Sequence, residues 1–331
     1  MIRVIAPRPG DGVAIMKLWR HLWDLHESWG SYPGTRDPAV YASLADRVDS
    51  EARAREGSPL LDKHIHLVAV SGESIVGQVE GWVEGHGLLR STPVTCEVRS
   101  LVVDPDHQGK GVGRMLMREL ARTAREAAGK PVFLAAEVFD ANPARDFYER
   151  IGYAYVARTA RLSLKRCSAD PGTRVRPADS CDALPLALFD QLLARRRLQC
   201  GDLRFDRERA IEASMLSAIA TYVVSTRKSP TEFVRVAEDG RVLGASTLGT
   251  MQLDPPFRSG VRAVLARVSV DAGTSTRDAV ADLVRSCSVF ARERGAESLE
   301  ITDLPPTPSA LTDAVLFTGA ETWSRVAGKL F

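Results

Sequence analysis

The sequence repeats itself at a spacing of 167 residues, and this repeat constrains the fold more than any other feature. Val102-Val103-Asp104 is echoed by Ser269-Val270-Asp271, and Gly152 is matched by Gly319 in the same register. A shared register of apolar strands and glycines indicates a duplicated unit. We therefore predict two similar domains, residues 1–166 and 174–331, joined by a polar linker over residues 167–173.

Length, charge and hydropathy limit the classes of protein that the chain can represent. Its 331 residues exceed the roughly 250–300 that one hydrophobic core usually serves. The formal net charge is +2, so no strong basic field favours nucleic acid as a partner. No apolar run reaches the roughly 18 residues of a membrane span, and the N-terminus resembles a strand rather than a signal peptide. We predict a cytoplasmic monomer or homodimer without nucleic-acid or membrane partners.

The cysteines indicate a reducing environment. They are odd in number and form no C-x-x-C pair, so we interpret them as reduced thiols and expect no zinc site. They are Cys96, Cys167, Cys181, Cys200 and Cys287.

Strand and helix patterns alternate in the first unit. We predict strands near residues 2–6, 65–70, 75–84, 94–103, 131–137 and 153–164, and helices near 11–28, 38–55, 112–128 and 141–150. Pro143 suits the first turn of the last helix, with Asn142 or Asp140 as N-cap and Gly152 as its C-terminal stop. Alternation combined with hairpins predicts the α/β (α+β) class, with each domain a mixed, mostly antiparallel twisted sheet flanked by helices.

A glycine-rich turn joins the strand ending at Val103 to the helix that follows. Its sequence is Gln108-Gly109-Lys110-Gly111-Val112-Gly113. Backbone N–H groups at a helix N-terminus are free, and together with the helix dipole they bind a pyrophosphate. Glycines let the main chain approach the phosphates without an intervening Cβ. The alternative interpretation is a turn that binds no ligand, with Lys110 simply solvated.

A second motif lies downstream of this turn. From Asn142 to Tyr153 the chain reads Asn-Pro-Ala-Arg-Asp-Phe-Tyr-Glu-Arg-Ile-Gly-Tyr. Together the two motifs resemble the GNAT superfamily of acyl-CoA-dependent N-acyltransferases, through its Q/R-x-x-G-x-G/A signature and its late N-x-x-A-x-x-F-Y-x-x-x-G-F/Y segment. The resemblance implies acetyl-CoA as co-substrate and no metal. It also implies a bulged strand whose main chain, at Leu101, Val102 and Val103, pairs with the pantetheine arm and polarises the thioester.

The resemblance also suggests catalytic residues. Tyr148 is the candidate general acid for the departing CoA thiolate, because its reference pKa near ~10 is close to that of a thiol; the alternative is packing against the sheet. Asn142 is expected to bind the pantetheine arm or to cap its helix. Glu97 is the candidate base for the attacking amine, or else a structural partner of Arg99. The rival bases are Glu80, Glu84, Glu137 and Asp140.

The loop after the first helix is the expected acceptor site, as in the family. Trp29 and Tyr32 stand beside glycine and proline in this loop and are candidate walls of a substrate pocket. Trp19 and Trp23 share a face of the preceding helix, which favours core packing. Glu80 and other nearby carboxylates would make the cleft acidic, which suits a cationic amine.

The second unit has lost the glycine-rich turn. At the 167-residue spacing, Asp278 takes the place of Gly111 and Val280 takes the place of Gly113. A carboxylate would repel the phosphates, and valine would block their close approach. We therefore expect a degenerate copy that covers the first domain or shapes its acceptor cleft.

These observations predict an N-acetyltransferase that transfers an acetyl group from acetyl-CoA to the primary amine of a small molecule by direct attack. Antibiotics and amino-acid-derived metabolites are candidate acceptors. Two alternatives remain open, a protein or peptide N-acetyltransferase and a non-catalytic acyl-CoA-binding sensor or scaffold.

Overall fold

The computed structural model describes residues 1–84, 93–166, 174–206, 218, 221, 231–271 and 275–331. In the N-terminal half (residues 1–166), the strands are β1 (Ile2–Ile5), β2 (Leu60–Leu61), β3 (His64–Ser71), β4 (Ser74–Glu84), β5 (Val94–Val103), β6 (Val132–Phe139) and β7 (Ala154–Ser163). The helices of this half are α1 (Gly12–Ser28), α2 (Pro38–Arg55), α3 (Val112–Ala128) and α4 (Asp146–Arg150).

The C-terminal half (residues 174–331) follows the same order of elements. Its strands are β8 (Val175–Pro177), β9 (Thr231–Val236), β10 (Val242–Gln252), β11 (Val261–Val270), β12 (Ala296–Leu304) and β13 (Glu321–Leu330). Its helices are α5 (Ala183–Gln199), α8 (Thr276–Glu293) and α9 (Ala310–Phe317). The bounds of β11 and β13 lie 167 residues after those of β5 and β7, so these elements recur at the spacing of the sequence repeat.

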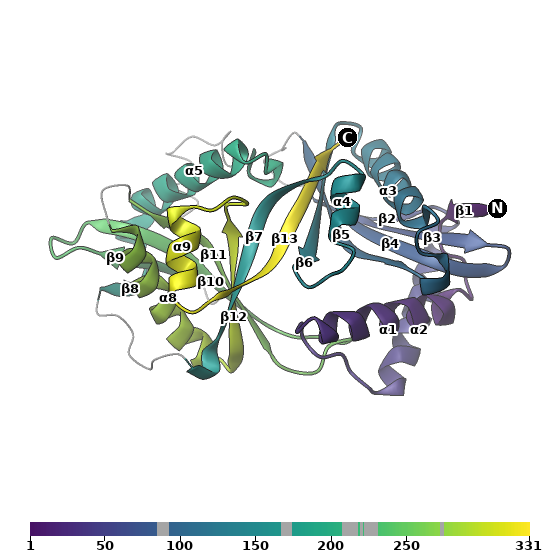
Figure 1. Cartoon of the computed structure of the whole chain (residues 1–331), viewed down its shortest axis with the longest axis horizontal. Helices are drawn as coiled ribbons and strands as arrows, with labels where there is room; N and C mark the ends of the chain where they lie inside the picture. The colour runs from purple at the N-terminus through teal and green to yellow at the C-terminus, as the bar shows by residue number, and fades with distance from the viewer. Residues whose placement is uncertain (85–92, 167–173, 207–217, 219–220, 222–230, 272–274) are drawn as a thin grey trace.

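One 13-stranded sheet runs through the molecule, in the order β1-β3-β4-β5-β6-β13-β7-β12-β11-β10-β9-β8, with β2 paired to β3 (Figure 1). Among the described strands, only β5–β6 and β11–β12 are parallel pairs. This confirms the predicted α/β class with a mixed, mostly antiparallel sheet. The structure differs from the expectation of two separate sheets, because the last strands are exchanged. β13 pairs with β6 of the N-terminal half, and β7 pairs with β12 of the C-terminal half.

The exchange of β7 and β13 bears on the domain boundaries. These two strands also pair with each other, so they form the centre where the halves meet (Figure 1). The division into residues 1–166 and 174–331 stays a prediction, and the predicted linker 167–173 lies outside the described residues.

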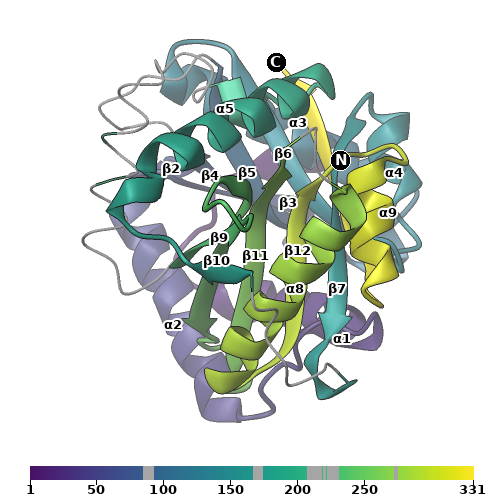
Figure 2. The ribbon, with the colours of Figure 1, turned by 90° about the vertical axis from the view of Figure 1, so that its left-hand side faces the viewer.

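Helices cover both faces of the sheet and bury separate cores. On one face of the N-terminal half, α3 packs through Leu116 and Leu120 onto Leu67. On the other face, α1 and α2 pack around Val68, because successive strand residues point to opposite faces. In the C-terminal half, α8 and α9 share one core, while α5 covers the opposite face (Figure 2).

The predicted strands of the N-terminal half are all present, but its last helix is shorter than predicted. The Asn142 side chain accepts a hydrogen bond from the Ala144 N–H at 2.8 Å, and the Asn142 carbonyl accepts one from the Arg145 N–H at 3.1 Å. This turn delays α4 to Asp146, so the prediction of Pro143 in the first helical turn is wrong. Gly152 follows the helix with φ of +85°, as predicted for a C-terminal stop.

Two further expectations concern the cellular environment. Cys96, Cys181, Cys200 and Cys287 are free thiols, and Cys167 lies outside the described residues. None of the helices in the described part of the chain is long and apolar enough to cross a membrane.

Candidate active site

The sheet splits between β5 and β6. The two strands pair in parallel only from Val94–Val132 to Val98–Ala136. Directly beyond this point, the register of β5 with β4 shifts, so that Arg99 has no partner between Val98 and Ser100. Such a bulge bends a strand and frees its backbone groups. The main chain of residues 101–103 therefore leaves β6 at the place where the resemblance predicted a bulge.

The glycine-rich turn lies at the end of this strand and opens α3. Gly109 and Gly111 have φ of +71° and +82°, a left-handed conformation that favours glycine. At Gly113, an added Cβ would lie 3.3 Å from Cζ of Phe147, so a larger side chain would press against α4. The first N–H groups of α3 have no acceptor within the helix. They and the helix dipole form a site suited to an anion.

A cavity of about 640 Å³, which we name the loop cavity, lies against this turn. It gathers all of the residues predicted to bind the cofactor together with one predicted acceptor residue, Trp29. Helix α1 supplies a further wall through Leu22 and Leu25. The predicted residues that line it are Leu101, Val102, Val103, Gln108, Gly109, Lys110, Gly111, Val112, Gly113 and Asn142.

Side chains of the turn also bond within it. The Gln108 Nε2 donates to the Val103 carbonyl at 3.1 Å, and the Lys110 Nζ donates to the Asp106 carbonyl at 2.7 Å. The Asn142 Oδ1 accepts a hydrogen bond from the Ala144 N–H, so the Asn142 Nδ2 is the group that can donate to a ligand. Asn142 stands two residues before Ala144 rather than three, so this segment is one residue shorter than the pattern it resembles.

Tyr148 lies next to the loop cavity rather than among the residues that line it. Phe147 lines the cavity, and its ring centroid is 5.3 Å from that of Tyr148. Tyr148 is 8 % exposed and packs with Tyr153 in the core beneath α3. Burial raises the pKa of Tyr148, which keeps the phenol protonated. A protonated phenol is the form that a general acid requires, but the raised pKa makes Tyr148 a weaker acid than the thiol-matched phenol expected from the sequence.

A second cavity, of about 420 Å³, lies where the two halves meet, and we name it the junction cavity. From the N-terminal half it is lined by Tyr32, Glu97 and Glu137. Strands and loops of the C-terminal half form the opposite wall. The charged and aromatic residues of that wall are Arg204, Phe257, Arg262, Glu300, Asp303 and Trp323.

Aromatic rings separate the two cavities. His26 lines the junction cavity and Trp29 lines the loop cavity, and their ring centroids are 5.4 Å apart. Phe139, on β6, lies 4.9 Å from the His26 ring. Burial lowers the pKa of His26 to about 4, so the imidazole is neutral at pH 7. The cavities are thus neighbours on the two sides of this small cluster, beside the split in the sheet.

Two carboxylates of the N-terminal half face the junction cavity, and their surroundings differ. Glu97 forms an ion pair with Arg99 at 2.7 Å, the structural pairing that the sequence left open. Glu137 accepts a hydrogen bond from the Ser324 hydroxyl at 2.5 Å and has no ion pair among the described residues. Its side chain is exposed through the open cavity, and protein atoms surround it on the other sides. This enclosure raises the pKa of Glu137, against the opposing effect of the Ser324 hydrogen bond.

Tyr32 is held by the C-terminal half. Its hydroxyl donates to the Glu300 Oε1 at 2.8 Å, and the Arg262 Nη2 binds the Glu300 Oε2 at 2.6 Å. The connection between β10 and β11 also reaches the loop after α1, where the Thr35 N–H donates to the Pro256 carbonyl at 2.6 Å. The acceptor loop predicted from the sequence is therefore fixed by residues more than 200 positions away.

Glu80 does not line either of these cavities. It accepts from Ser100 Oγ at 2.7 Å and bonds His64 Nε2 at 2.9 Å. Ligand atoms of His64, His66 and Glu80 lie within 4.8 Å of one another, as in a metal site. However, the Arg55 guanidinium lies 2.9 Å from His64 Nδ1 and places a positive charge against the group. The arrangement is therefore that of a hydrogen-bond network rather than of a cation site.

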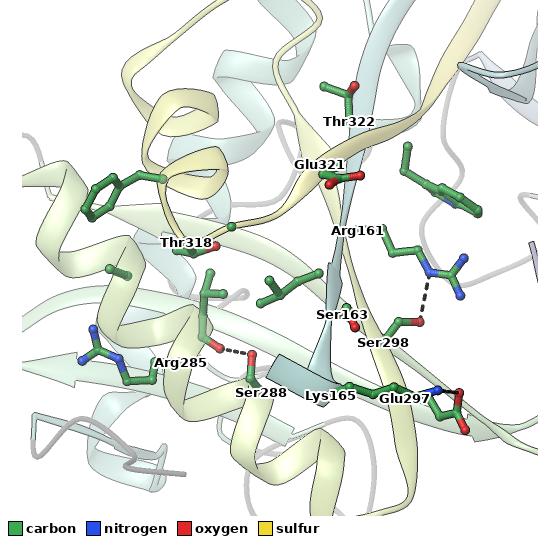
Figure 3. Close-up of a pocket in the computed structure, with 16 residues that line it drawn as sticks. Arg161, Ser163, Lys165, Arg285, Ser288, Glu297, Ser298, Thr318, Glu321 and Thr322 are labelled. Carbon is green, nitrogen blue, oxygen red and sulfur yellow. Dashed lines mark hydrogen bonds and ion pairs between the residues drawn. The ribbon is translucent and has the colours of Figure 1, made fainter. Parts of the chain in front are cut away.

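The C-terminal half has no open turn at the equivalent place. Helix α8 begins at Thr276, three residues earlier than the 167-residue spacing from α3 would place it. The Ala279 N–H bonds the Ser275 carbonyl at 3.0 Å, so a helical turn occupies the position of the glycine-rich turn. A larger cavity, of about 960 Å³, lies between α8, β7 and β13 (Figure 3). The first residue of α8 that lines it is Ala281, so this cavity lies away from the start of the helix.

The residues that sequence analysis missed belong to the C-terminal half. Glu300, Arg262 and Trp323 line the junction cavity, yet no motif marks them. Glu137 was recognised only as one of several rival bases. Its position at the split in the sheet, which singles it out, depends on the pairing of β5 and β6.

The split, the bulge and the helix N-terminus together define an acyl-transferring enzyme. Residues 19–153 match the model of the acetyltransferase (GNAT) family, and the chain belongs to this family. Proteins of this family use acetyl-CoA.

Two curated relatives match parts of the chain. It is 34 % identical over 122 residues to the N-alpha-acetyltransferase RimI of Mycobacterium tuberculosis, which covers 34 % of this chain and 72 % of the relative. It is 42 % identical over 66 residues to the streptothricin acetyltransferase of Streptomyces lavendulae, which covers 20 % of this chain and 34 % of that relative.

Two solved structures share the fold over the whole chain. A GCN5-related N-acetyltransferase from Sphaerobacter thermophilus superposes with a TM-score of 0.58 at 14 % identity, over 99 % of this chain and 95 % of that one. A tandem GNAT protein from the clavulanic acid biosynthesis pathway superposes with a TM-score of 0.51 at 14 % identity, over 100 % and 98 %.

Proposed function

We propose that the protein transfers an acetyl group from acetyl-CoA to the primary amine of a small molecule. The observation that carries this proposal is the meeting of two cavities beside the split between β5 and β6. The loop cavity offers a helix N-terminus for the pyrophosphate, and the junction cavity offers carboxylates for an amine. The relative named streptothricin acetyltransferase supports a small acceptor.

The donor side follows from the loop cavity. The N–H groups at the start of α3 would hold the pyrophosphate, with Gln108, Lys110 and the flanking glycines around it. The main chain of residues 101–103 would pair with the pantetheine arm, and Asn142 Nδ2 would add a hydrogen bond. A backbone N–H of the bulged strand would then stabilise the oxyanion of the tetrahedral intermediate.

On the acceptor side, we assign the general base to Glu137 rather than Glu97, because Glu97 is already paired with Arg99. Glu137 takes a proton from the ammonium group, and the nitrogen lone pair attacks the thioester carbonyl carbon. The C–N bond forms to give a tetrahedral intermediate, which collapses as the C–S bond breaks and the thiolate takes a proton from Tyr148. The nitrogen loses its second proton, which restores the Tyr148 phenol, and Glu137 returns its own proton to solvent. The products are an amide and CoA thiol, and no acyl-enzyme is needed.

Release of CoA thiol tests the proposal. Purified protein, acetyl-CoA and a panel of small primary amines are mixed, and the free thiol is followed by its reaction with a disulfide dye. We expect amine-dependent release with formation of the N-acetyl product by mass spectrometry. Binding of acetyl-CoA without release for any amine or peptide would instead support the sensor or scaffold alternative.

The RimI relative favours a second candidate function, acetylation of a peptide N-terminus. The two functions differ in the access that they need, because a peptide requires a groove that is open at its ends. Here the C-terminal half walls the junction cavity through Phe257 and Trp323. Faster acetylation of N-terminal peptides than of any small amine would establish the peptide function.

We predict one molecule of acetyl-CoA per chain. The C-terminal half has a helical turn where the N-terminal half has its open glycine-rich turn, and Asp278 in this first turn of α8 repels phosphate. Calorimetric titration measures the stoichiometry. Two sites per chain would contradict the assignment of a degenerate copy.

Replacement of Tyr148 by phenylalanine is expected to lower kcat by about 10²-fold, because the departing thiolate loses its proton donor. The dissociation constant of acetyl-CoA should remain unchanged. Tyr153→Phe is the matched control, since Tyr153 packs beside Tyr148 in the same core. Equal losses in the two variants would mean that Tyr148 acts through packing alone.

A further inference from the structure

The charges of the junction cavity balance except at one residue. Four carboxylates and three guanidinium groups line it. Each arginine has a carboxylate partner, with Arg99 on Glu97 at 2.7 Å and Arg262 on Glu300 at 2.6 Å. Arg204 pairs with Asp202 at 2.8 Å and faces Asp303 at 3.7 Å, and Asp202 also binds the buried Arg197.

Glu137 is the exception, because within the described part of the chain it accepts a hydrogen bond from the Ser324 hydroxyl and forms no ion pair. An acceptor with one positive charge would pair with Glu137 and complete the charge balance. If an acceptor also carries a carboxylate, that group would have to displace a carboxylate of the protein from one of these guanidinium groups. Desolvating that second charge without a free partner is costly.

The remaining walls are largely aromatic. Tyr32 and Phe257 form an edge-to-face pair with centroids 6.4 Å apart, and the Trp323 centroid lies 5.1 Å from that of Phe139. The Arg161 guanidinium already lies over the Tyr32 and Trp323 rings, at 5.1 and 4.4 Å from their centroids, so the Phe257 ring is the one left for the acceptor. Aromatic faces attract cations and cover apolar carbon. The cavity volume of about 420 Å³ corresponds to a small molecule.

Glu300 connects these features. It is 2 % exposed, and it binds Arg262 from β11 and Tyr32 from the acceptor loop at the same time. It thereby neutralises the guanidinium group that an acceptor carboxylate would otherwise reach, and it fixes the aromatic wall.

We infer that the acceptor is a small amine with one positive charge and no carboxylate, and that Glu300 of the C-terminal half enforces this choice. The inference rests on the proposed acetyl transfer and adds the class of acceptor and a specificity-determining residue. The C-terminal half thus acts as the selective wall of the active site in the N-terminal half.

The test compares acceptors that differ only in a carboxylate, namely tyramine with tyrosine and butylamine with norvaline. The full-length protein is assayed by thiol release at one pH. We expect kcat/KM to be at least about ten-fold higher for the amine of each pair. The α-amino group of an amino acid is the less basic one, so protonation alone would favour the amino acid.

Charge variants test the role of Glu300. Glu300→Gln leaves Arg262 without its carboxylate, so the preference for the amine is expected to fall about ten-fold. Arg262→Gln leaves Glu300 unneutralised, so the preference is expected to rise. Opposite shifts are not expected from a merely structural defect, and Arg262→Gln keeps the test available if Glu300→Gln fails to fold. In both variants, the dissociation constant of acetyl-CoA should stay within about two-fold of the wild-type value.

Glu297→Gln is the matched control. Glu297 lies on the same strand, is 78 % exposed and lines the separate C-terminal cavity, where it pairs with Lys165 (Figure 3). Its acceptor preference should equal that of the wild type. Equal or greater activity on the amino acids in the wild type, or unchanged preference in both charge variants, would overturn the inference. Absence of transfer to every amine would instead overturn the proposed function.

Discussion

Replacement of Glu137 by glutamine is expected to lower kcat by about 10²-fold to 10⁴-fold, the usual contribution of a general base. Glutamine keeps the size of the side chain and accepts the Ser324 hydrogen bond, but it does not take a proton from the acceptor. The dissociation constant of acetyl-CoA should not change, because Glu137 lines the junction cavity and not the loop cavity. Steady-state kinetics and calorimetry measure the two quantities separately.

The pH dependence gives this prediction a second readout. Enclosure raises the pKa of Glu137 above its ordinary value. The base is active when it is ionised, so activity should be lost as the pH falls through this raised pKa. In Glu137→Gln, the pH profile of kcat should lack this fall at acidic pH.

Glu97→Gln is the matched control for the base, because Glu97 lines the same cavity and is paired with Arg99. Its kcat should fall by less than about ten-fold. A large loss in Glu97→Gln together with near-normal activity in Glu137→Gln would transfer the role of base to Glu97.

Replacement of Gly111 by aspartate is expected to weaken acetyl-CoA binding by about 10²-fold or more. The new carboxylate would stand at the start of α3, where the pyrophosphate is expected. Repulsion between two unit charges about 4 Å apart amounts to about 4 kcal/mol at an effective dielectric constant of ~20. Calorimetric titration of the purified variant measures the loss.

Gly111→Ala separates charge from backbone conformation. Gly111 has φ of +82°, so any side chain there costs about 1–2 kcal/mol of strain. Alanine carries this strain without the charge and should lose less affinity than aspartate. Folding of the aspartate variant is favoured by its charge, because an anion stabilises a helix N-terminus. Equal affinities of the two variants would show that the phosphates bind elsewhere.

The sequence predicted those parts of the fold that depend on neighbouring residues. Helix α3 spans the predicted residues 112–128, because its apolar side chains recur on one face and Gly129 ends it with φ of +64°. The glycine-rich turn is equally local, since glycine adopts the positive φ seen at Gly109 and Gly111 without steric cost. The start of α4 was predicted too early, because a side-chain hydrogen bond of Asn142 competes with the helix.

The acceptor side was only partly predictable. Tyr32 was recognised from its loop, but its partner Glu300 lies 268 residues away, and no spacing in the sequence relates the two. Glu80 was expected in the cleft as one of the carboxylates that would make it acidic. The structure turns it toward His64 and Ser100 instead, since a single residue of register changes the face on which a strand residue lies.

The sequence by itself determined the repeat, the strands and helices of the N-terminal half, the glycine-rich turn and the membership in an acetyl-transferring family. Only the tertiary structure decided that β7 and β13 are exchanged between the halves, and that both halves therefore wall one cavity. The physical reason is that the two strands occupy the same place in a repeated pattern. Their local sequences fit a central strand of either half, and only the packing of the whole sheet selects the neighbours of each.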